Sequence, residues 1–218
     1  SPVRDLDNFV VAGASKRGWT TWLTAAADDR VSAIIPMVID VLNMPAQMEH
    51  HRKAYAGYPP YDPANGIFGG YSVAIKDYVD LQIFERFGAA HGDSLLKLVD
   101  PYSYRNLLTM PKFIANSTGD QFFLPDSSRF YFYDLPGSNY LHYAPNTDHS
   151  LTDGLMVDED TLAGMLAFYM AHVRNMNRFT SDDVVLPTYQ WRRLQNIERI
   201  EYDKDDEPVT RVFARLEV

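Results

Sequence analysis

Three residues in this chain have the types and the chain order that acyl transfer through a serine nucleophile requires: Ser15, Asp120 and His149. Serine is a weak nucleophile until a neighbouring imidazole takes its proton, and a carboxylate must orient that imidazole and stabilise its charged form. The order nucleophile, acid, histidine is the one that a major class of α/β enzymes uses. We therefore expect His149 to accept the proton of Ser15 and Asp120 to hold His149.

The strongest local signal is the string Gly13-Ala14-Ser15-Lys16-Arg17-Gly18, which places a serine between an apolar run and a helical pattern. A tight strand-to-helix turn needs small residues around its nucleophile, and the following helix directs its positive end at that residue. The backbone N–H of Lys16 is then the expected oxyanion donor. The spacing departs from G-x-S-x-G because Arg17 precedes the second glycine, so a helix N-cap is the alternative role for Ser15.

Two acidic residues compete for the role of the triad acid. Asp120 follows one apolar run, His149 follows the next, and parallel sheets place their sites at such strand ends. Asp40 ends another apolar run and is the alternative acid. Asp148 adjoins His149, but neighbours in sequence seldom point at each other. Asp120 also stands in a Gly-Asp pair that is typical of turns.

Positioning these residues requires strands that end at one edge of a sheet. Short apolar runs predict buried strands at 9–12, 31–39, 112–116 and 140–144. Residues 15–18 are expected to form a turn, and helical patterns cover 19–27, 125–134 and 159–176. The alternation of strands and helices predicts an α/β fold with a parallel sheet that helices cover.

Two segments do not follow this alternation. Residues 41–109 are less regular and include the Pro/Gly-rich stretch AGYPPYDPANGIFGGY, which we expect to be a loop. We interpret 41–109 as a cap inserted over the active site. From 183 onward, alternating apolar residues predict a β-rich appendage over 183–218, so the main domain would cover 1–182.

The other histidines lack the spacing of a metal site. His50, His51 and His91 lie in the cap segment, and the pattern H-E-x-x-H is absent. His142 lies inside the run 140–144 and is expected to pack within or at the edge of the sheet. We therefore expect neither a metal ion nor a cofactor.

Several side chains near the triad have two interpretations each. Phe122 and Phe123 follow Asp120 and either line a substrate pocket or pack the core. Lys16 and Arg17 either attract an acidic substrate group or are solvated or paired with an acidic residue of the cap.

Composition excludes several classes of function. The chain has 20 basic and 29 acidic residues, a net charge of −9, which argues against nucleic-acid binding. It contains no cysteine, which excludes disulfide scaffolds and zinc fingers. No apolar run reaches the roughly 18 residues that a membrane span needs. The first residues, SPVRDLDNFVVAG, also lack the features of a signal peptide.

Three long strings resemble the PhoPQ-activated pathogenicity-related protein family: FVVAGASKRGWTTWLTAAADDRVSAIIPMVIDVLNMPAQMEH, DPYSYRNLLTMPKFIANSTGDQFFLPDSSRFYFYDLPG and YAPNTDHSL. The resemblance implies an α/β-hydrolase fold related to serine peptidases and esterases. It implies a secreted or periplasmic location and an association with virulence regulation. Carried over by motif position, the family's triad falls on Ser15, Asp120 and His149.

Members of that family are longer than this chain, which begins at the nucleophile strand. We therefore expect the C-terminal half of an α/β-hydrolase, whose preceding strands and second oxyanion donor belong to an absent N-terminal half. On this view the chain alone is not a competent enzyme.

The sequence leaves three functions open. The first is a secreted serine hydrolase acting on a peptide or ester substrate. The second is a non-catalytic secreted signalling or binding protein on the same fold. The third is a carbohydrate (uronate) esterase, because glucuronoyl esterases share the G-x-S-x-x-G spacing with a basic residue after the serine.

Overall fold

The computed structural model describes residues 7–56, 67–68, 70–152, 158–172, 200–202 and 208–212. The chain divides into two compact units, residues 1–180 and 181–218. In the second unit, strands β7 (Ile200–Tyr202) and β8 (Pro208–Val212) pair in antiparallel fashion.

The first unit holds the parallel sheet. The strands of this unit are β1 (Phe9–Ala14), β2 (Val31–Met37), β3 (Ile67–Phe68), β4 (Tyr71–Ser72), β5 (Lys112–Ser117) and β6 (Asn139–Ala144). Its α-helices are α1 (Lys16–Ala27), α2 (Met44–Ala54), α3 (Lys76–Asp80), α4 (Ala90–Val99) and α5 (Glu159–His172). Short 3₁₀ helices cover Val73–Ile75, Phe84–Arg86, Pro101–Leu107, Ser127–Phe130 and Phe132–Asp134.

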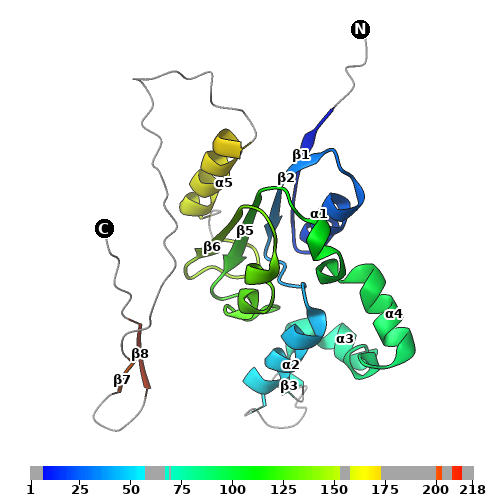
Figure 1. The fold of residues 1–218 in the computed structure, drawn as a ribbon. Coiled ribbons are helices and arrows are strands. Elements are labelled where there is room, and N and C mark those ends of the chain that lie inside the picture. The colour runs from blue at the N-terminus through cyan, green and yellow to red at the C-terminus, as the bar shows by residue number, and fades with distance from the viewer. Residues whose placement is uncertain are drawn as a thin grey trace. The chain divides into compact units, whose positions relative to one another are not determined.

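The four main strands run parallel in the order β1-β2-β5-β6, which confirms the predicted α/β fold (Figure 1). The strand ladders continue past the ends of two strands. The Val38 N–H donates to the Ala115 carbonyl at 2.7 Å, and the Thr118 N–H donates to the Ala144 carbonyl at 3.1 Å. These bonds align the carboxyl ends of the strands, so the loops that follow them begin side by side.

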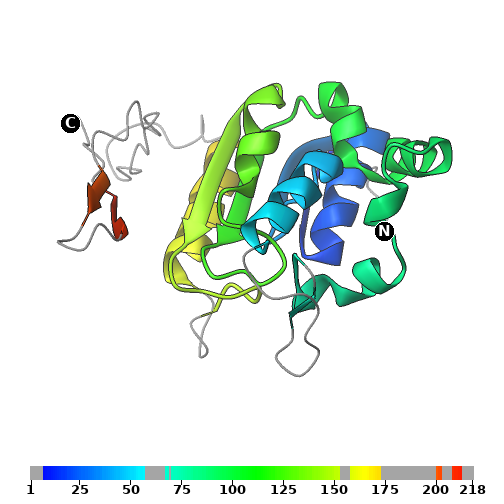
Figure 2. The same ribbon diagram turned by 90° about the horizontal axis from the view of Figure 1, so that it is seen from below.

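Helices cover both faces of this sheet (Figures 1 and 2). Successive residues of a strand point to opposite faces, so each strand contributes to two cores. Ile34 of β2 packs with Trp22 of α1, whereas its neighbours Ala33 and Ile35 pack with Phe168 of α5. Burial on both faces explains why these strands are continuous apolar runs.

The segment between β2 and β5 carries α2, α3 and α4, and Figure 1 shows α2 and α3 beyond the carboxyl ends of the strands. A buried carboxylate fixes the start of α2. Asp100 accepts the backbone N–H groups of Asn43 at 3.2 Å, Met44 at 2.8 Å and Tyr102 at 2.9 Å. Burial raises the pKa of Asp100, and these three donors oppose that shift. Asp100 therefore connects the start of the segment, at Asn43 and Met44, to its last part, at Tyr102.

The predicted helix over 125–134 is wrong. The structure has two 3₁₀ helices there, Ser127–Phe130 and Phe132–Asp134, separated at Tyr131. Tyr131 has φ −147° and ψ −25°, values outside the helical range, and its ring is buried in the core. The helix is interrupted because burying this ring takes precedence over continuing the helical backbone.

Other boundaries also differ from the predictions. Helix α1 begins at Lys16, within the predicted turn 15–18, and β2 ends at Met37, before Val38 with φ 45°. Within the stretch 56–71 that was predicted to be a loop, Gly70 forms a bridge with Tyr55, and Ile67 and Phe68 of β3 pair with β4. Helix α5 is described only as far as His172, so the predicted residues 173–176 lie outside the described part.

Within the part of the chain that the structure describes, no helix is both long enough and apolar enough to span a membrane.

Candidate active site

Ser15 occupies a strained turn between β1 and α1. Its backbone has φ 53° and ψ −125°, a region that non-glycine residues seldom adopt. Glycines on both sides make the turn possible. A Cβ on Gly13 would lie 2.6 Å from the Arg17 carbonyl carbon, and a Cβ on Gly18 would lie 2.5 Å from Ile39 Cγ2. The string around Ser15 is therefore a strand-to-helix elbow, and its glycines are required by close contacts.

The elbow is held against β2. The Ser15 N–H donates to the Met37 carbonyl at 2.9 Å, and the Ser15 carbonyl accepts the Trp19 N–H at 3.0 Å. The Lys16 N–H is the first of helix α1 and is one of the N–H groups that have no acceptor within their own helix. Ser15 forms no side-chain cap to α1, so its hydroxyl is not used as an N-cap.

The structure brings Ser15, His149 and Asp120 together in one hydrogen-bonded chain. His149 Nε2 lies 2.8 Å from Ser15 Oγ, and His149 Nδ1 lies 2.8 Å from Asp120 Oδ2. The Asp120 side chain is 3% exposed and the His149 side chain is 16% exposed. Asp120 Oδ1 accepts the N–H groups of Phe122 at 2.7 Å and Phe123 at 3.2 Å. The carboxylate is thus fixed by two donors of its own loop while its second oxygen faces the imidazole.

Loop contacts also orient His149. Its backbone N–H donates to Gln121 Oε1 at 3.2 Å, and the Phe122 ring lies 4.3 Å from the imidazole, centroid to centroid. The Gly119 N–H donates to the Thr147 carbonyl at 2.9 Å, which joins the two loops. A Cβ on Gly119 would approach that carbonyl oxygen to 2.8 Å, so a larger residue would push the loops apart.

Asp40, the alternative acid, faces a different set of partners. It accepts hydrogen bonds from the Tyr131 hydroxyl and from Asn116 Nδ2, which lies within 3.1 Å of both carboxylate oxygens. The residue is 1% exposed. Burial raises the pKa of Asp40 to about 6, against the opposing effect of these hydrogen bonds, and the nearby charge of Asp120 adds to the increase. The structure places Asp120, not Asp40, at His149.

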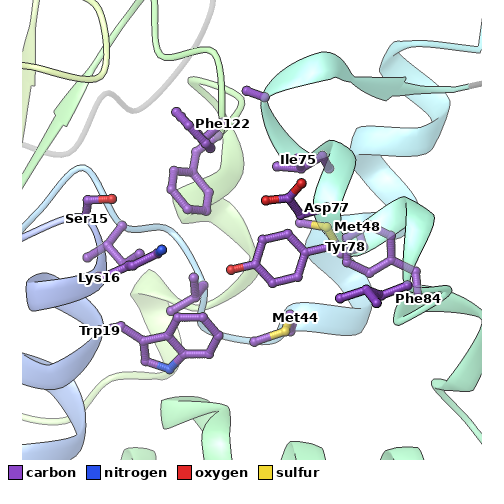
Figure 3. A pocket seen from close by; sticks show the side chains of 15 residues that line it. Ser15, Lys16, Trp19, Met44, Met48, Ile75, Asp77, Tyr78, Phe84 and Phe122 are labelled. Carbon is purple, nitrogen blue, oxygen red and sulfur yellow. The ribbon is translucent and has the colours of Figure 1, made fainter. Parts of the chain in front are cut away.

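A cavity of about 310 Å³ opens beside Ser15 (Figure 3). Its lining is mainly apolar and includes rings from α1, from the segment between β2 and β5, and from the loop after β5. Phe122 and Phe123 both line the cavity and also pack against the core, so they have both of the roles considered for them. Lys16, Asp77 and Tyr78 bring polar atoms to the wall. The cavity can therefore hold an apolar group next to the serine hydroxyl.

The remaining histidines lie away from this chain of hydrogen bonds. His50 contacts Asp126 at 2.8 Å, and His142 contacts Thr161 Oγ1 at 2.9 Å. His51 is buried, stacks on Tyr55 and accepts the Ser72 N–H at 3.1 Å. Burial lowers the pKa of His51 to about 4. Among the described residues, no group of His, Asp and Glu side chains has the arrangement of a metal site.

Sequence reasoning missed several residues that line the cavity. Trp19 was detectable because it stands one helical turn after Ser15 and so shares its side of α1. Met44 and Met48 share a face of α2 for the same reason. Nothing in the sequence around Asp77 or Tyr78 indicates that these residues reach the site.

The chain matches the family described as PhoPQ-activated pathogenicity-related protein over residues 3–210. It is also 35% identical, over 187 residues, to autocrine proliferation repressor protein A of Dictyostelium discoideum. That match covers 85% of this chain and 33% of the relative, so the chain spans about a third of the length of the relative.

Solved structures with the same fold include esterases and peptidases. Acylaminoacyl peptidase from Pyrococcus horikoshii aligns with a TM-score of 0.54 at 13% identity, over 82% of this chain and 26% of that one. Acetyl xylan esterase from Paenibacillus sp. R4 aligns with a TM-score of 0.54 at 18% identity, over 78% of this chain and 46% of that one. These similarities show that the chain has the α/β-hydrolase fold.

Proposed function

The chain belongs to the PhoPQ-activated pathogenicity-related protein family, and from that premise we propose that it is a serine hydrolase acting on an ester or amide bond. The observation that carries this proposal is the chain of hydrogen bonds Ser15–His149–Asp120, with 2.8 Å at each contact. The positive φ of Ser15 and the α/β-hydrolase fold support it, because this fold presents its nucleophile on such an elbow.

In the proposed mechanism, Ser15 Oγ attacks the substrate carbonyl carbon while His149 Nε2 takes the hydroxyl proton. The Nδ1–H of His149 donates to Asp120 Oδ2, which selects the reactive tautomer and stabilises the imidazolium. The proton then passes from Nε2 to the leaving group as the acyl-enzyme forms. A water molecule, deprotonated by His149, releases the acyl group and restores Ser15.

Negative charge on the carbonyl oxygen needs donors near Ser15. The Lys16 N–H at the start of α1 is the proposed donor, and the helix dipole of α1 favours negative charge at the same point. Removing one such donor typically costs about 100- to 1000-fold in kcat.

The test is covalent labelling by a fluorophosphonate of the purified full-length protein that contains this chain, with Ser15→Ala as the control. We expect a single label on Ser15 that is absent from the variant. If the folded protein takes no label, the hydrolase proposal is wrong.

The alternative is a signalling or binding protein that keeps the fold without its chemistry. The observation that favours it is the name of the Dictyostelium relative, which describes a repressor of proliferation and no reaction. If the wild type takes the label and the Ser15→Ala variant nevertheless keeps the biological effect of the protein, that result would support this alternative.

We also propose that the protein acts in the periplasm or outside the cell, on the strength of its family. Fractionation of cells expressing the gene tests this location. Recovery of the protein in the cytoplasm alone would contradict it.

A further inference from the structure

One carboxylate in the cavity wall has no role in the proposed triad. Asp77 lies in the first turn of α3, and its side chain lines the cavity beside Ser15. In Figure 3 this carboxylate points into the cavity from the side opposite Ser15 and Lys16. Among residues 7–56, 67–68, 70–152 and 158–172, none forms a hydrogen bond or an ion pair with it. Asp80 of the same helix, by contrast, is paired with Lys76.

Aromatic rings surround the space that this carboxylate faces. They come from three parts of the chain: Trp19, Tyr78, Phe84, Phe122 and Phe123. The face of an aromatic ring carries partial negative charge and attracts cations, most strongly where water is scarce. A carboxylate in a cavity lined by aromatic rings therefore makes a wall that favours an ammonium group attached to an apolar body.

Lys16 is the competing polar group, because its ammonium also lines the cavity and can attract an anion. Two observations favour a cation as the ligand. An aromatic lining favours cations over anions, and the net charge of −9 raises the local concentration of cations around the protein. Lys16 also directly follows Ser15, where negative charge develops in the proposed reaction.

We propose that Asp77 determines substrate specificity by binding an ammonium group on an otherwise apolar acyl group. Esters or amides whose acyl group carries an ammonium at the end of an apolar chain, away from the carbonyl, have this chemistry. The cavity of about 310 Å³ is at the small end of ligand pockets, which are roughly 300–1000 Å³, and has room for one such acyl group. The inference rests on the proposed function and adds the substrate class.

Binding of two matched probes tests the site without requiring catalysis. The amine 3-phenylpropylamine and the alcohol 3-phenylpropan-1-ol differ only in ammonium for hydroxyl, and calorimetry measures the affinity of each. We expect the amine to bind about three- to tenfold more tightly, since Asp77 is exposed and salt screens its charge. Asp77→Asn should remove this preference, and the control Asp80→Asn, on the same helix but outside the cavity, should keep it.

Hydrolysis of methyl 6-aminohexanoate, whose ammonium is remote from the carbonyl, and of methyl hexanoate gives the catalytic counterpart. The wild-type ratio of kcat/KM should favour the amino ester, and Asp77→Asn should bring that ratio close to one by raising KM for the amino ester.

The outcomes separate this inference from the proposed function. Labelling of Ser15 together with equal affinity for amine and alcohol would overturn the inference alone. Tighter binding of 3-phenylpropionate than of the amine, abolished by Lys16→Met, would also overturn it by assigning specificity to Lys16. Preference for the amine that is lost in Asp77→Asn, in a protein that takes no fluorophosphonate, would reject the hydrolase and leave the ammonium site in place.

Discussion

The loops that follow β2 and β5 each carry an aspartate three residues after the strand ends, yet the two carboxylates have different surroundings. Asp40 is sealed in the core, and its hydrogen bonds come from Tyr131 and Asn116. Asp120 receives two backbone N–H groups from its own loop and presents one oxygen to His149. One carboxylate joins elements of the core, and the other orients a side chain at the surface.

The difference shows what decides the role of an acid at a strand end. Both residues have the chemistry to hold an imidazole. Asp40 lacks the access, because the ring of Tyr131 and the side chain of Asn116 occupy its acceptor positions. Asp120 has access because the tight turn at Gly119 places its loop beside Thr147 and therefore beside His149.

The largest effect that separates the two acids is expected in catalysis. Asp120→Asn keeps the shape of the side chain but favours the wrong imidazole tautomer, so kcat/KM should fall by about 10⁴-fold. Asp40→Asn should change kcat/KM by less than about tenfold, since it does not contact His149. Steady-state kinetics on any ester that the protein hydrolyses measures both variants. Comparable losses in the two would contradict the assignment.

The next largest effect is on stability, where the order of the two acids reverses. Asp40→Ala leaves the Tyr131 hydroxyl and the Asn116 amide buried without an acceptor, so the free energy of unfolding should fall by about 2–4 kcal/mol. Asp120→Ala leaves unpaired the donors of Phe122, Phe123 and His149, residues that are only partly buried and closer to water, and should cost less. Urea denaturation gives both values. An equal loss in the two variants would show that the hydrogen bonds of Asp40 with Tyr131 and Asn116 do not stabilise the fold more than those of Asp120.

Stability should also depend on pH through Asp40. Its pKa is about 6 in the folded protein against an ordinary value of 3.8, so the folded state binds the proton more tightly than the unfolded state. This contribution to stability is complete below about pH 4 and is lost as the pH rises through about 6, amounting to about 3 kcal/mol at most. Relative to Asp40→Asn, the wild type should therefore lose stability between pH 4 and pH 7. A difference in stability between wild type and Asp40→Asn that stays constant over this pH range would show that Asp40 does not have a raised pKa.

The smallest effect is expected from a change in the loop that carries Asp120. Gln121→Ala removes the acceptor of the His149 N–H, a neutral and partly exposed hydrogen bond worth about 0.5–1.5 kcal/mol. We expect kcat to fall by less than about tenfold with little change in KM. A loss as large as that of Asp120→Asn would mean that the loop, and not the carboxylate, positions the imidazole.

Most of the sheet was predictable from the sequence, because buried parallel strands are continuous apolar runs whatever surrounds them. Helix α2 was not predicted, although its buried positions Met44, Gln47, Met48 and His51 have helical spacing. Two of these four residues are polar. Gln47 is buried because its amide donates to the Leu42 and Ser127 carbonyls, partners that only the folded chain supplies.

The candidate site shows the same limit. Residue type and chain order were enough to select Ser15 and His149 and to favour Asp120, whereas setting Asp40 aside required knowledge of what fills the space around each carboxylate. The assignment of Asp77 to the cavity wall depended on the path of residues 41–109, which local patterns do not encode.

The separation of Ser15 from His149 along the chain also determines when the site forms during folding. The two are 134 residues apart, whereas Asp120 and His149 are 29 apart. Closing the larger loop costs more chain entropy, and contacts between distant residues form slowly. The pairing of acid and imidazole can therefore precede the arrival of the nucleophile. Labelling of Ser15 during refolding should consequently report completion of the whole sheet and lag behind the recovery of secondary structure.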